Sequence, residues 1–293
     1  MSMRLRIDHN TGFRYATTVL SSYNEARMTP ASGAGQNVWS SRLSVEPLPW
    51  SFTYSGYWGS LVTAFEVHEP HDELRVQARS LVEISPTTGD PAELTWDIGD
   101  GAPLPDDLDW ADLAQPSISE EFSELLLVSP RTEPGIELVE RARELAEELP
   151  PRVAALGVCR LLRKEVSYVP GATRVSSHAV EAWDVRQGVC QDFAHLAVGA
   201  LRTLGIPARY VSGYLHPKRE PVVGKTVPAE SHAWIEFYVG RWVAYDVTNT
   251  QVPGDRHVVV ARGRDYNDVP PLRGIYSGGA STMFVSVEMT RLT

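Results

Sequence analysis

Three residues in the second half of the chain have side chains that could together attack an amide bond. Cys190 lies in the segment GVCQDFAHL, residues 188–196, where a helical pattern begins. The dipole and the free N–H groups of a helix N-terminus favour the thiolate, the nucleophilic form of cysteine. His232 and Asp246 follow in strand-like runs, and such residues can take up the thiol proton and orient the imidazole. The three residues form a candidate Cys-His-Asp triad.

Each of these residues also has a structural explanation. Cys190 could be a packing residue, His232 a hydrogen-bonded histidine within a strand, and Asp246 a cap at a strand end. A set of Cys, His and Asp also occurs by accident in many sequences. The residue types alone therefore leave the catalytic and the structural interpretations open.

The helix that would carry the thiol is predicted at residues 190–204. Its apolar side chains recur at spacings of three and four, and Gly205 with Pro207 supplies the stop signal. This pattern predicts a helix that is buried on one face and has Cys190 at its start.

Two further helices are predicted at residues 135–149 and 152–165, each with apolar residues on one face. Cys159 falls inside the second helix without a nearby polar partner, and we interpret it as a small core residue. Strands are expected at residues 208–215, 257–261 and 282–290.

A hairpin of residues 231–238 and 242–248 determines whether the proposed histidine and aspartate can meet. With a three-residue loop at residues 239–241, His232 would lie about one pair away from Asp246 on the same face. A two-residue turn would place them on opposite faces. The loop is therefore the sharpest structural check on the triad.

The N-terminal part of the chain is predicted to be a β domain. Short strand patterns with no helix between them extend to about residue 86, which suggests an antiparallel β-sandwich. The aromatic residues at 50–67 are interpreted as core and edge packing, with a ligand platform as the alternative. Residues 86–116, rich in Pro, Gly and Asp, are expected to be a connector. The expected division is residues 1–110 and 111–293, in an α+β fold.

Composition limits the partners and the compartment. The net charge is −10, and no Lys/Arg cluster is present, so nucleic acid and anionic membranes are not expected partners. Without a secretory h-region or a run of about 18 apolar residues, a cytoplasmic location is expected. The sequence does not determine the oligomeric state.

Metal and cofactor sites have little support in the sequence. Only two cysteines are present, and neither a C-x-x-C nor an H-E-x-x-H spacing occurs, so no metal and no cofactor is expected. The acidic residues at 264–268 suggest a calcium loop only weakly. A cleft rim or a solvated turn is the preferred interpretation.

Four segments together resemble the transglutaminase-like superfamily, most closely its bacterial branch with an added N-terminal β domain. They are GVCQDFAHL, LRTLGIPARYVSGYL, SHAWIEFYV and WVAYDVTNT. The resemblance implies a papain-like core in which the catalytic helix packs on an antiparallel sheet. It also implies that Cys190 is the nucleophile, His232 the general base and then acid, and Asp246 the orienting carboxylate.

Residues that would support the reaction are less clearly marked. The backbone N–H of Cys190 is a natural oxyanion-hole donor. A second donor should come from upstream, where Tyr168 or Trp183 could reach, although both are more simply explained as packing residues. Within the motif, His195 is expected to be structural and Asp192 to complement the helix dipole.

The expected reaction is a cysteine-dependent acyl transfer on an amide bond of a protein or peptide substrate, through a thioester. Hydrolysis is ranked above transfer to an amine, because a cytoplasmic location and the lack of a clear calcium loop do not favour protein cross-linking. The alternative is a non-catalytic binding or scaffold module that keeps the fold. The N-terminal domain could cover the core sheet or position a protein substrate.

Overall fold

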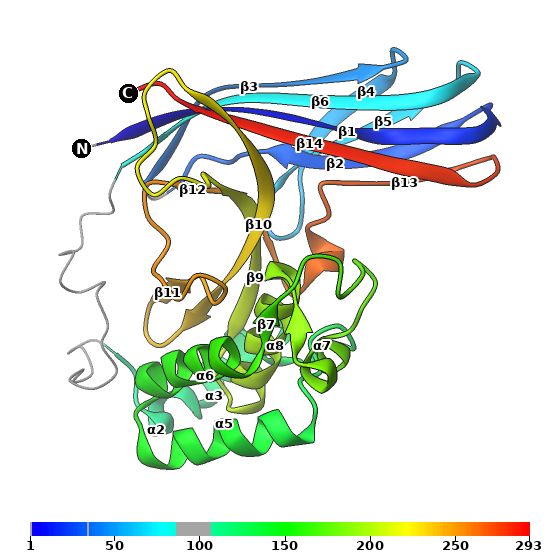
Figure 1. The fold of residues 1–293 in the computed structure, drawn as a ribbon. Coiled ribbons are helices and arrows are strands. Elements are labelled where there is room, and N and C mark those ends of the chain that lie inside the picture. Colours follow the sequence, from blue (N-terminus) through cyan, green and yellow to red (C-terminus); the bar gives the residue numbers. More distant parts are fainter. Residues whose placement is uncertain (1, 34, 86–106) are drawn as a thin grey trace.

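The computed structural model describes residues 2–33, 35–85 and 107–293. Its largest element is an eight-stranded sheet that extends from the β-rich part of the molecule to the helices (Figure 1). The strand order is β12-β9-β10-β14-β1-β6-β3, and β11 pairs with β10. The bounds are β1 (Met3–Val19), β3 (Gln36–Glu46), β6 (His71–Ile84), β9 (Ala208–Leu215), β10 (Thr226–Tyr238), β11 (Trp242–Tyr245), β12 (His257–Gly263) and β14 (Ser281–Arg291).

A second sheet of four strands completes a sandwich with the N-terminal part of the first. Its order is β13-β2-β5-β4, and its bounds are β2 (Ser22–Thr29), β4 (Trp50–Ser55), β5 (Leu61–Val67) and β13 (Leu272–Tyr276). Val19 and Leu74 from the first sheet share a buried core with Met28 and Phe65 from the second. Both sheets are antiparallel in the part of the chain that the structure describes. The predicted N-terminal antiparallel sandwich is confirmed.

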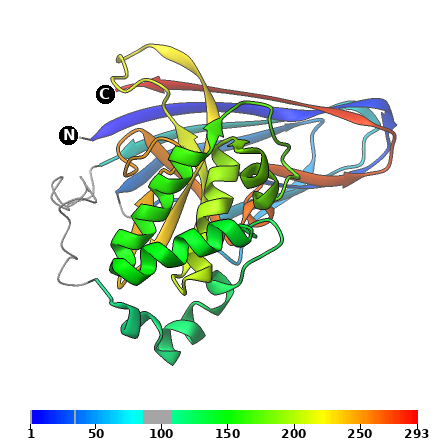
Figure 2. The same cartoon turned by 60° about the horizontal axis from the view of Figure 1, so that its bottom comes forward.

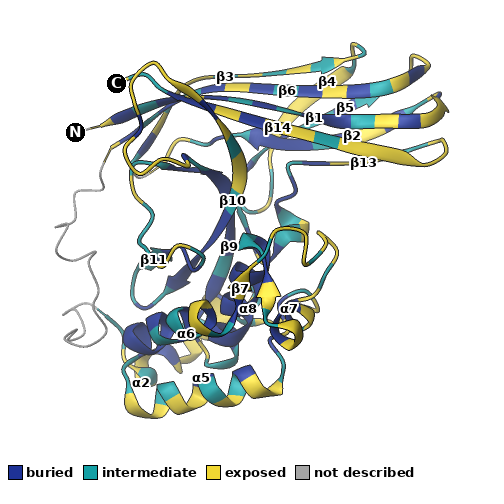
Figure 3. Cartoon of the chain, viewed as in Figure 1, coloured by how far each residue is buried: buried dark blue, intermediate teal, exposed yellow. Residues whose placement is uncertain are grey.

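The aromatic residues of β4 differ from expectation. Trp50, Phe52 and Tyr54 have exposed fractions of 62%, 50% and 37%. Their rings contact one another along the strand, with centroids 5.4 and 5.8 Å apart. Because β4 is the edge strand of its sheet, the edge position is confirmed. The expected core packing is wrong for these three residues, because every residue of β4 is exposed (Figure 3).

The C-terminal strands belong to the same sheets as the N-terminal strands. β14 lies between β10 and β1, with Arg291 opposite Leu5, and β13 pairs with β2. The two termini therefore lie close together (Figure 1). The division into residues 1–110 and 111–293 remains a prediction, and sheet pairing crosses it. Most of the expected connector, at residues 86–106, falls outside the described residues.

The helices gather at one end of the long sheet (Figure 2). The three predicted helices are confirmed as α5 (Ile136–Glu148), α6 (Pro151–Glu165) and α8 (Cys190–Thr203). Five shorter elements were not predicted: α2 (Trp110–Leu113), α3 (Pro116–Glu121), α4 (Ser123–Leu126), α7 (Ala179–Val185) and the 3-10 turn η1 (Tyr266–Asp268). A parallel pair, β7 (Ser167–Tyr168) and β8 (Gln187–Gly188), precedes α8. Among the described residues, no helix is both long and apolar enough to cross a membrane.

α8 is buried on all sides, so the expectation of one buried face is wrong. It packs against β9 and β10 and is also contacted by α5, α6 and α7. Its polar residues are buried with partners of their own. Arg202, for example, donates to the carbonyls of Ala208 and Leu127 at 2.9 and 2.8 Å. These partners lie outside α8, so the apolar periodicity of the helix could not indicate that its polar face is also buried.

The hairpin of β10 and β11 has the predicted three-residue loop. Tyr238 pairs with Trp242, and the Val239 amide donates to the Arg241 carbonyl at 3.1 Å across the loop. Gly240, in the middle, has a φ of 92°, a conformation that glycine adopts without strain. This loop sets the register that brings the proposed histidine and aspartate to one place.

Candidate active site

The turn before Cys190 is held by a buried carboxyl group. Asp192 Oδ2 accepts hydrogen bonds from the Val189 amide at 2.7 Å and from the Thr173 hydroxyl at 2.6 Å. A Cβ on Gly188 would lie only 2.8 Å from the Cβ of Asp192, so glycine is needed for this approach. Burial raises the pKa of Asp192, although both donors oppose the shift. The segment GVCQD thereby places the thiol of Cys190 at the N-terminus of α8, where the helix dipole favours negative charge.

The two thiols of the chain lie in different environments. Cys159 is fully buried in the main core, and burial raises the pKa of its thiol. Cys190 is only partly buried. The interpretation of Cys159 as a core residue is confirmed, and Cys190 is the thiol that reagents can reach.

His232 connects the thiol to a carboxylate. Its Nε2 lies 2.8 Å from Asp246 Oδ2, and its ring is also hydrogen-bonded to Cys190. Because Nε2 faces the carboxylate, Nδ1 is the nitrogen left to face the thiol. Burial disfavours the charged ring, but the hydrogen bonds and charges of Asp246 and Cys190 outweigh it and raise the pKa of His232 to about 10. The charged imidazolium form of His232 is therefore favoured at neutral pH.

Asp246 is fully buried and accepts hydrogen bonds from three neighbouring residues. Besides His232, these are His257 Nε2 at 3.1 Å, the Asn249 side-chain amide at 2.8 Å and the Asn249 backbone N–H at 3.1 Å. Burial alone would raise the pKa of Asp246, but these donors hold it well below its usual range. The backbone of Asp246 is fixed as well, through a two-way bridge to Gln251.

His257, on β12, is a site residue that the sequence did not mark. The Gly254 amide donates to its Nδ1 at 3.1 Å, so Nδ1 carries no proton. A neutral imidazole must then carry its proton on Nε2, which points to Asp246. Burial lowers the pKa of His257 despite the nearby carboxylate, which keeps the ring in this neutral form. Only its place in a strand pattern was visible in the sequence, and nothing there linked it to Asp246.

The same cluster is the one group among the described residues that could hold a metal ion. The possible ligand atoms of His232, Asp246 and His257 all lie within 4.8 Å of one another. In the arrangement above, however, Nε2 of His257 is a proton donor and has no free lone pair. The cluster is better described as a hydrogen-bonded network around Asp246.

A cavity of about 510 Å³ lies beside His232. Tyr168, one of the two candidates for an oxyanion-hole donor, lines this cavity and is 41% exposed. Burial, followed by the negative charges of Cys190 and Glu230, raises the pKa of Tyr168. Its phenol is therefore a neutral hydroxyl donor at the wall of this cavity.

Trp183, the other candidate, is directed elsewhere. Its indole N–H donates to Glu137 Oε2 at 3.2 Å, and the Arg186 guanidinium lies 3.6 Å from its ring centroid. The side chain is buried in the main core. It acts in packing between α7 and α5, and its single N–H is already used.

His195, five residues after the thiol, is fully buried. Its Nε2 accepts a hydrogen bond from the Tyr266 backbone N–H at 3.1 Å. Burial lowers the pKa of His195 to about 3, so the ring is neutral and ties α8 to η1. This geometry agrees with the structural role expected for it.

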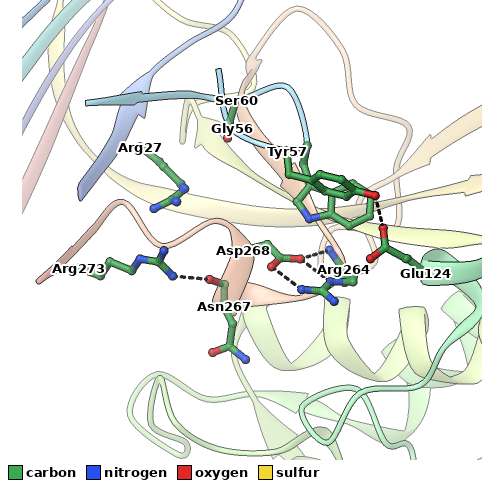
Figure 4. A pocket seen from close by; sticks show the side chains of 10 residues that line it. Arg27, Gly56, Tyr57, Ser60, Glu124, Arg264, Asn267, Asp268 and Arg273 are labelled. Atoms are coloured by element: carbon green, nitrogen blue, oxygen red, sulfur yellow. Dashed lines mark hydrogen bonds and ion pairs between the residues drawn. The ribbon is translucent and has the colours of Figure 1, made fainter. Parts of the chain in front are cut away.

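The acidic residues at 264–268 have protein partners. Asp268 is bound by the Arg264 guanidinium at 2.9 and 3.0 Å, as Figure 4 shows. Asp265 accepts from the Ser129 hydroxyl at 2.6 Å and from the Asn267 amide at 2.8 Å. The segment lines a different cavity, of about 390 Å³. Its carboxylates are thus used within the fold, which does not favour a calcium loop.

Comparison with family models matches both parts of the chain. Residues 139–247 match the transglutaminase-like superfamily, and residues 5–83 match the bacterial transglutaminase-like N-terminal region. The first match contains Cys190, His232 and Asp246.

Individual relatives support the same assignment. An uncharacterized protein of Mycobacterium leprae is 41% identical over 290 residues, which cover 99% of each chain. A protein-glutamine gamma-glutamyltransferase of Pseudomonas aeruginosa is 30% identical over 125 residues, 39% of this chain and 19% of that protein. A crystal structure from Cytophaga hutchinsonii, described as a candidate cysteine protease, superposes with a TM-score of 0.74 at 21% identity and covers 100% of this chain and 92% of that one. The chain belongs to the transglutaminase-like superfamily, in the bacterial group that carries the additional N-terminal β region.

Proposed function

We propose that the protein is a cysteine-dependent enzyme that transfers the acyl group of an amide through a thioester. The observation that carries the proposal is the position of His232, which is hydrogen-bonded to both Cys190 and Asp246. A thiolate held beside an imidazolium is ready to attack a carbonyl carbon. Membership of the superfamily supports the same chemistry.

The first half-reaction would form the thioester. Cys190 Sγ attacks the amide carbonyl carbon, and a tetrahedral intermediate forms. His232 Nδ1 then gives its proton to the amide nitrogen as the C–N bond breaks, and ammonia or an amine leaves. Asp246 stays ionised and holds the ring in place throughout.

The oxyanion of the intermediate needs hydrogen-bond donors. The Cys190 backbone N–H, at the start of α8, would supply one. We assign the second to the Tyr168 hydroxyl, because Tyr168 lines the cavity and the charge of Cys190 contributes to its raised pKa. Trp183 is not assigned, since its N–H already donates to Glu137.

The second half-reaction would release the acyl group. His232 takes a proton from water as the water oxygen bonds to the carbonyl carbon, the C–S bond breaks, and the thiolate returns. An amine could enter in place of water. We rank hydrolysis of a peptide or amide first, because the carboxylates at 264–268 are bound within the fold and do not favour the calcium control typical of a cross-linking enzyme.

A library of glutamine peptides incubated with a labelled amine tests the reaction and its acceptor together. Release of ammonia or of new peptide N-termini, without incorporation of label, is expected. Cys190→Ala should abolish the release, whereas Cys159→Ala should retain it. Label incorporated in a Cys190-dependent manner would reverse the ranking of water over amines.

The alternative is a binding or scaffold module that uses the fold without turnover. Thiol reactivity separates it from an enzyme. At pH 6, iodoacetamide should alkylate Cys190 much faster than a free thiol such as glutathione, because the imidazolium of His232 stabilises the thiolate. A rate equal to that of glutathione would favour the scaffold.

We also propose a cytoplasmic location. Both cysteines are free thiols, which suits a reducing compartment. Fractionation of cells that express a tagged full-length protein would test this, and recovery in an extracytoplasmic fraction would contradict it.

A further inference from the structure

Strand β10 changes its neighbour along one edge, and His232 lies at the change. On one edge, β9 pairs with residues Glu230 to Phe237 without interruption. On the opposite edge, β14 pairs only with Thr226 to Ala229, and β11 pairs only with Ile235 to Tyr238. Residues 230–234 therefore have no strand partner on that edge within the described residues.

The direction of the backbone groups in this gap follows from the ladder. The Tyr238 amide donates to the Pro207 carbonyl at 2.8 Å, on the β9 side. N–H and C=O groups of successive residues in an antiparallel strand point alternately to the two edges, and the register between β9 and β10 has no shift. Even-numbered residues such as His232 thus bond to β9. Ser231 and Ala233 direct their N–H and C=O groups to the unpaired edge.

The other edge of β9 gives the same result independently. There the His216 amide donates to the Arg256 carbonyl at 3.0 Å, on the β12 side. By alternation, Leu215 and Gly213 must then bond toward β10, where their partners are Glu230 and His232. Both observations assign Ser231 to the open edge.

The cavity beside His232 follows this edge. Five consecutive residues of β10, from Pro228 to His232, line it. Successive side chains of a strand point to opposite faces, so a cavity that touches five in a row extends around the strand and is not confined to one face. Leu215, at the end of β9, and Pro217, just after it, line it as well. Ser231 itself is exposed, and Thr248 and Asn249 line the same cavity.

We propose that an extended segment of the substrate polypeptide adds to this edge of β10, pairs with the N–H and C=O of Ser231, and so delivers its amide to Cys190. This inference rests on the proposed function and specifies its substrate class as unfolded or extended polypeptide. Strand addition obtains affinity from main-chain hydrogen bonds. Apart from His232, the charged residues lining the cavity are Arg163 and Glu230, whose opposite charges do not by themselves select a charged substrate side chain.

A peptide probe with single N-methyl groups tests the pairing without altering the protein. The probe is a seven-residue peptide whose central glutamine carries a chloromethyl ketone in place of its carboxamide. Cys190 displaces the chloride, and a carbon–sulfur bond forms. N-methylation of the one residue whose N–H meets the Ser231 carbonyl should lower the rate of Cys190 alkylation about tenfold. N-methylation of either neighbouring residue should change the rate less than about twofold, because the N–H groups next to a paired one face away from β10.

The outcome of the scan is decisive in either direction. A loss confined to one position, with both neighbouring positions unaffected, supports strand addition, whereas equal effects at all positions or at none would overturn it. Iodoacetamide serves as a second reagent that needs no peptide contacts. If iodoacetamide fails to react with Cys190 faster than with glutathione, the proposed function fails. If it succeeds and no single position of the scan stands out from its neighbours, only the strand addition fails.

A protein variant provides a second measurement. Ser231→Pro removes the N–H that faces the open edge, and a strand edge without a partner tolerates proline. Thermal unfolding shows whether the variant is folded. The ratio of the peptide-probe rate to the iodoacetamide rate should fall about tenfold, consistent with the loss of one main-chain hydrogen bond near the reacting group. Comparison with Ser231→Ala, which removes only the hydroxyl, isolates the amide, and an unchanged ratio in Ser231→Pro would contradict the pairing.

Discussion

His257 Nε2 lies 3.1 Å from Asp246 Oδ2, the same carboxylate oxygen that faces the ring of His232. Asp246 is therefore held between two histidines with different tasks. His232 is charged and can transfer its proton, whereas His257 is neutral because burial lowers its pKa, and the Gly254 amide fixes its tautomer. We infer that His257 is a positioning residue: it orients the carboxylate that orients the catalytic ring, much as outer hydrogen bonds orient metal ligands.

Replacement of His257 should test this role. His257→Leu removes one donor from a buried carboxylate, worth about 1.5 kcal/mol, and the rate of Cys190 alkylation at pH 6 should fall about tenfold. His257→Gln offers an amide N–H in a similar position and should recover part of the rate. His68→Gln, at an exposed histidine, is the control. Equal loss in the Leu and Gln variants would indicate that the ring only fills space.

The charge of Asp246 should be visible in the pH dependence of Cys190. Asp246 raises the pKa of His232, which reaches about 10 against an ordinary value of 6.5. The stabilisation of the folded state by this ion pair is fully present below pH 6.5 and is lost as the pH rises through about 10. The alkylation rate of Cys190 should therefore change at correspondingly high pH, where the imidazolium of His232 loses its proton.

Asp246→Asn should move that change in rate to lower pH. The substitution keeps the size of the side chain but removes the negative charge that favours the imidazolium. Rate–pH profiles of Cys190 alkylation, measured from pH 5 to pH 11 by mass spectrometry, check the shift. Profiles that coincide for the two proteins would mean that Asp246 does not set the charge of His232.

Much of the site could be predicted because its parts are local. A helix start at Cys190 and a three-residue hairpin loop at 239–241 are each encoded within a few residues. The loop sets the register of His232 and Asp246, and the helix start presents the thiol. The packing of α8 against β10 that joins them is a contact between distant segments. The apolar periodicity of α5, α6 and α8 and the alternation in β1 and β6 were similarly readable.

The remaining features depend on contacts between distant segments. Period-two alternation identifies β14 as a strand but does not choose its partners, and nothing local places it between β10 and β1. His257 reaches Asp246 only because β12 pairs with β9. The sequence likewise cannot distinguish the exposed aromatic residues of β4 from core residues, because hydrophobicity alone does not show whether another element covers the strand.

Gly188→Ala should damage the site without touching the triad. The added Cβ would lie 2.8 Å from the Cβ of Asp192, so the turn that carries Cys190 must shift. We expect a loss of about 2 kcal/mol in the free energy of unfolding and slower alkylation of Cys190. Gly33→Ala is the matched control, because nothing lies within 4 Å of the added Cβ there. Denaturant unfolding and alkylation rates, measured on both variants, check the expectation. Equal stability of the two variants would show that the close approach of Gly188 and Asp192 is not required.

The shared sheets predict that residues 111–293 do not fold as a unit on their own. Without residues 1–110, β14 loses β1, with which it pairs from Tyr15 to Leu5, and β13 loses β2. Two strands would then present unpaired edges and apolar side chains such as Met289, which is fully buried in the intact protein. The truncated chain should be aggregated or lack a cooperative thermal transition, and co-expression with residues 1–110 should restore a soluble complex. Size-exclusion chromatography and thermal unfolding measure both. A truncated chain that is monomeric, cooperative in unfolding and reactive at Cys190 would instead establish residues 111–293 as an independent catalytic domain.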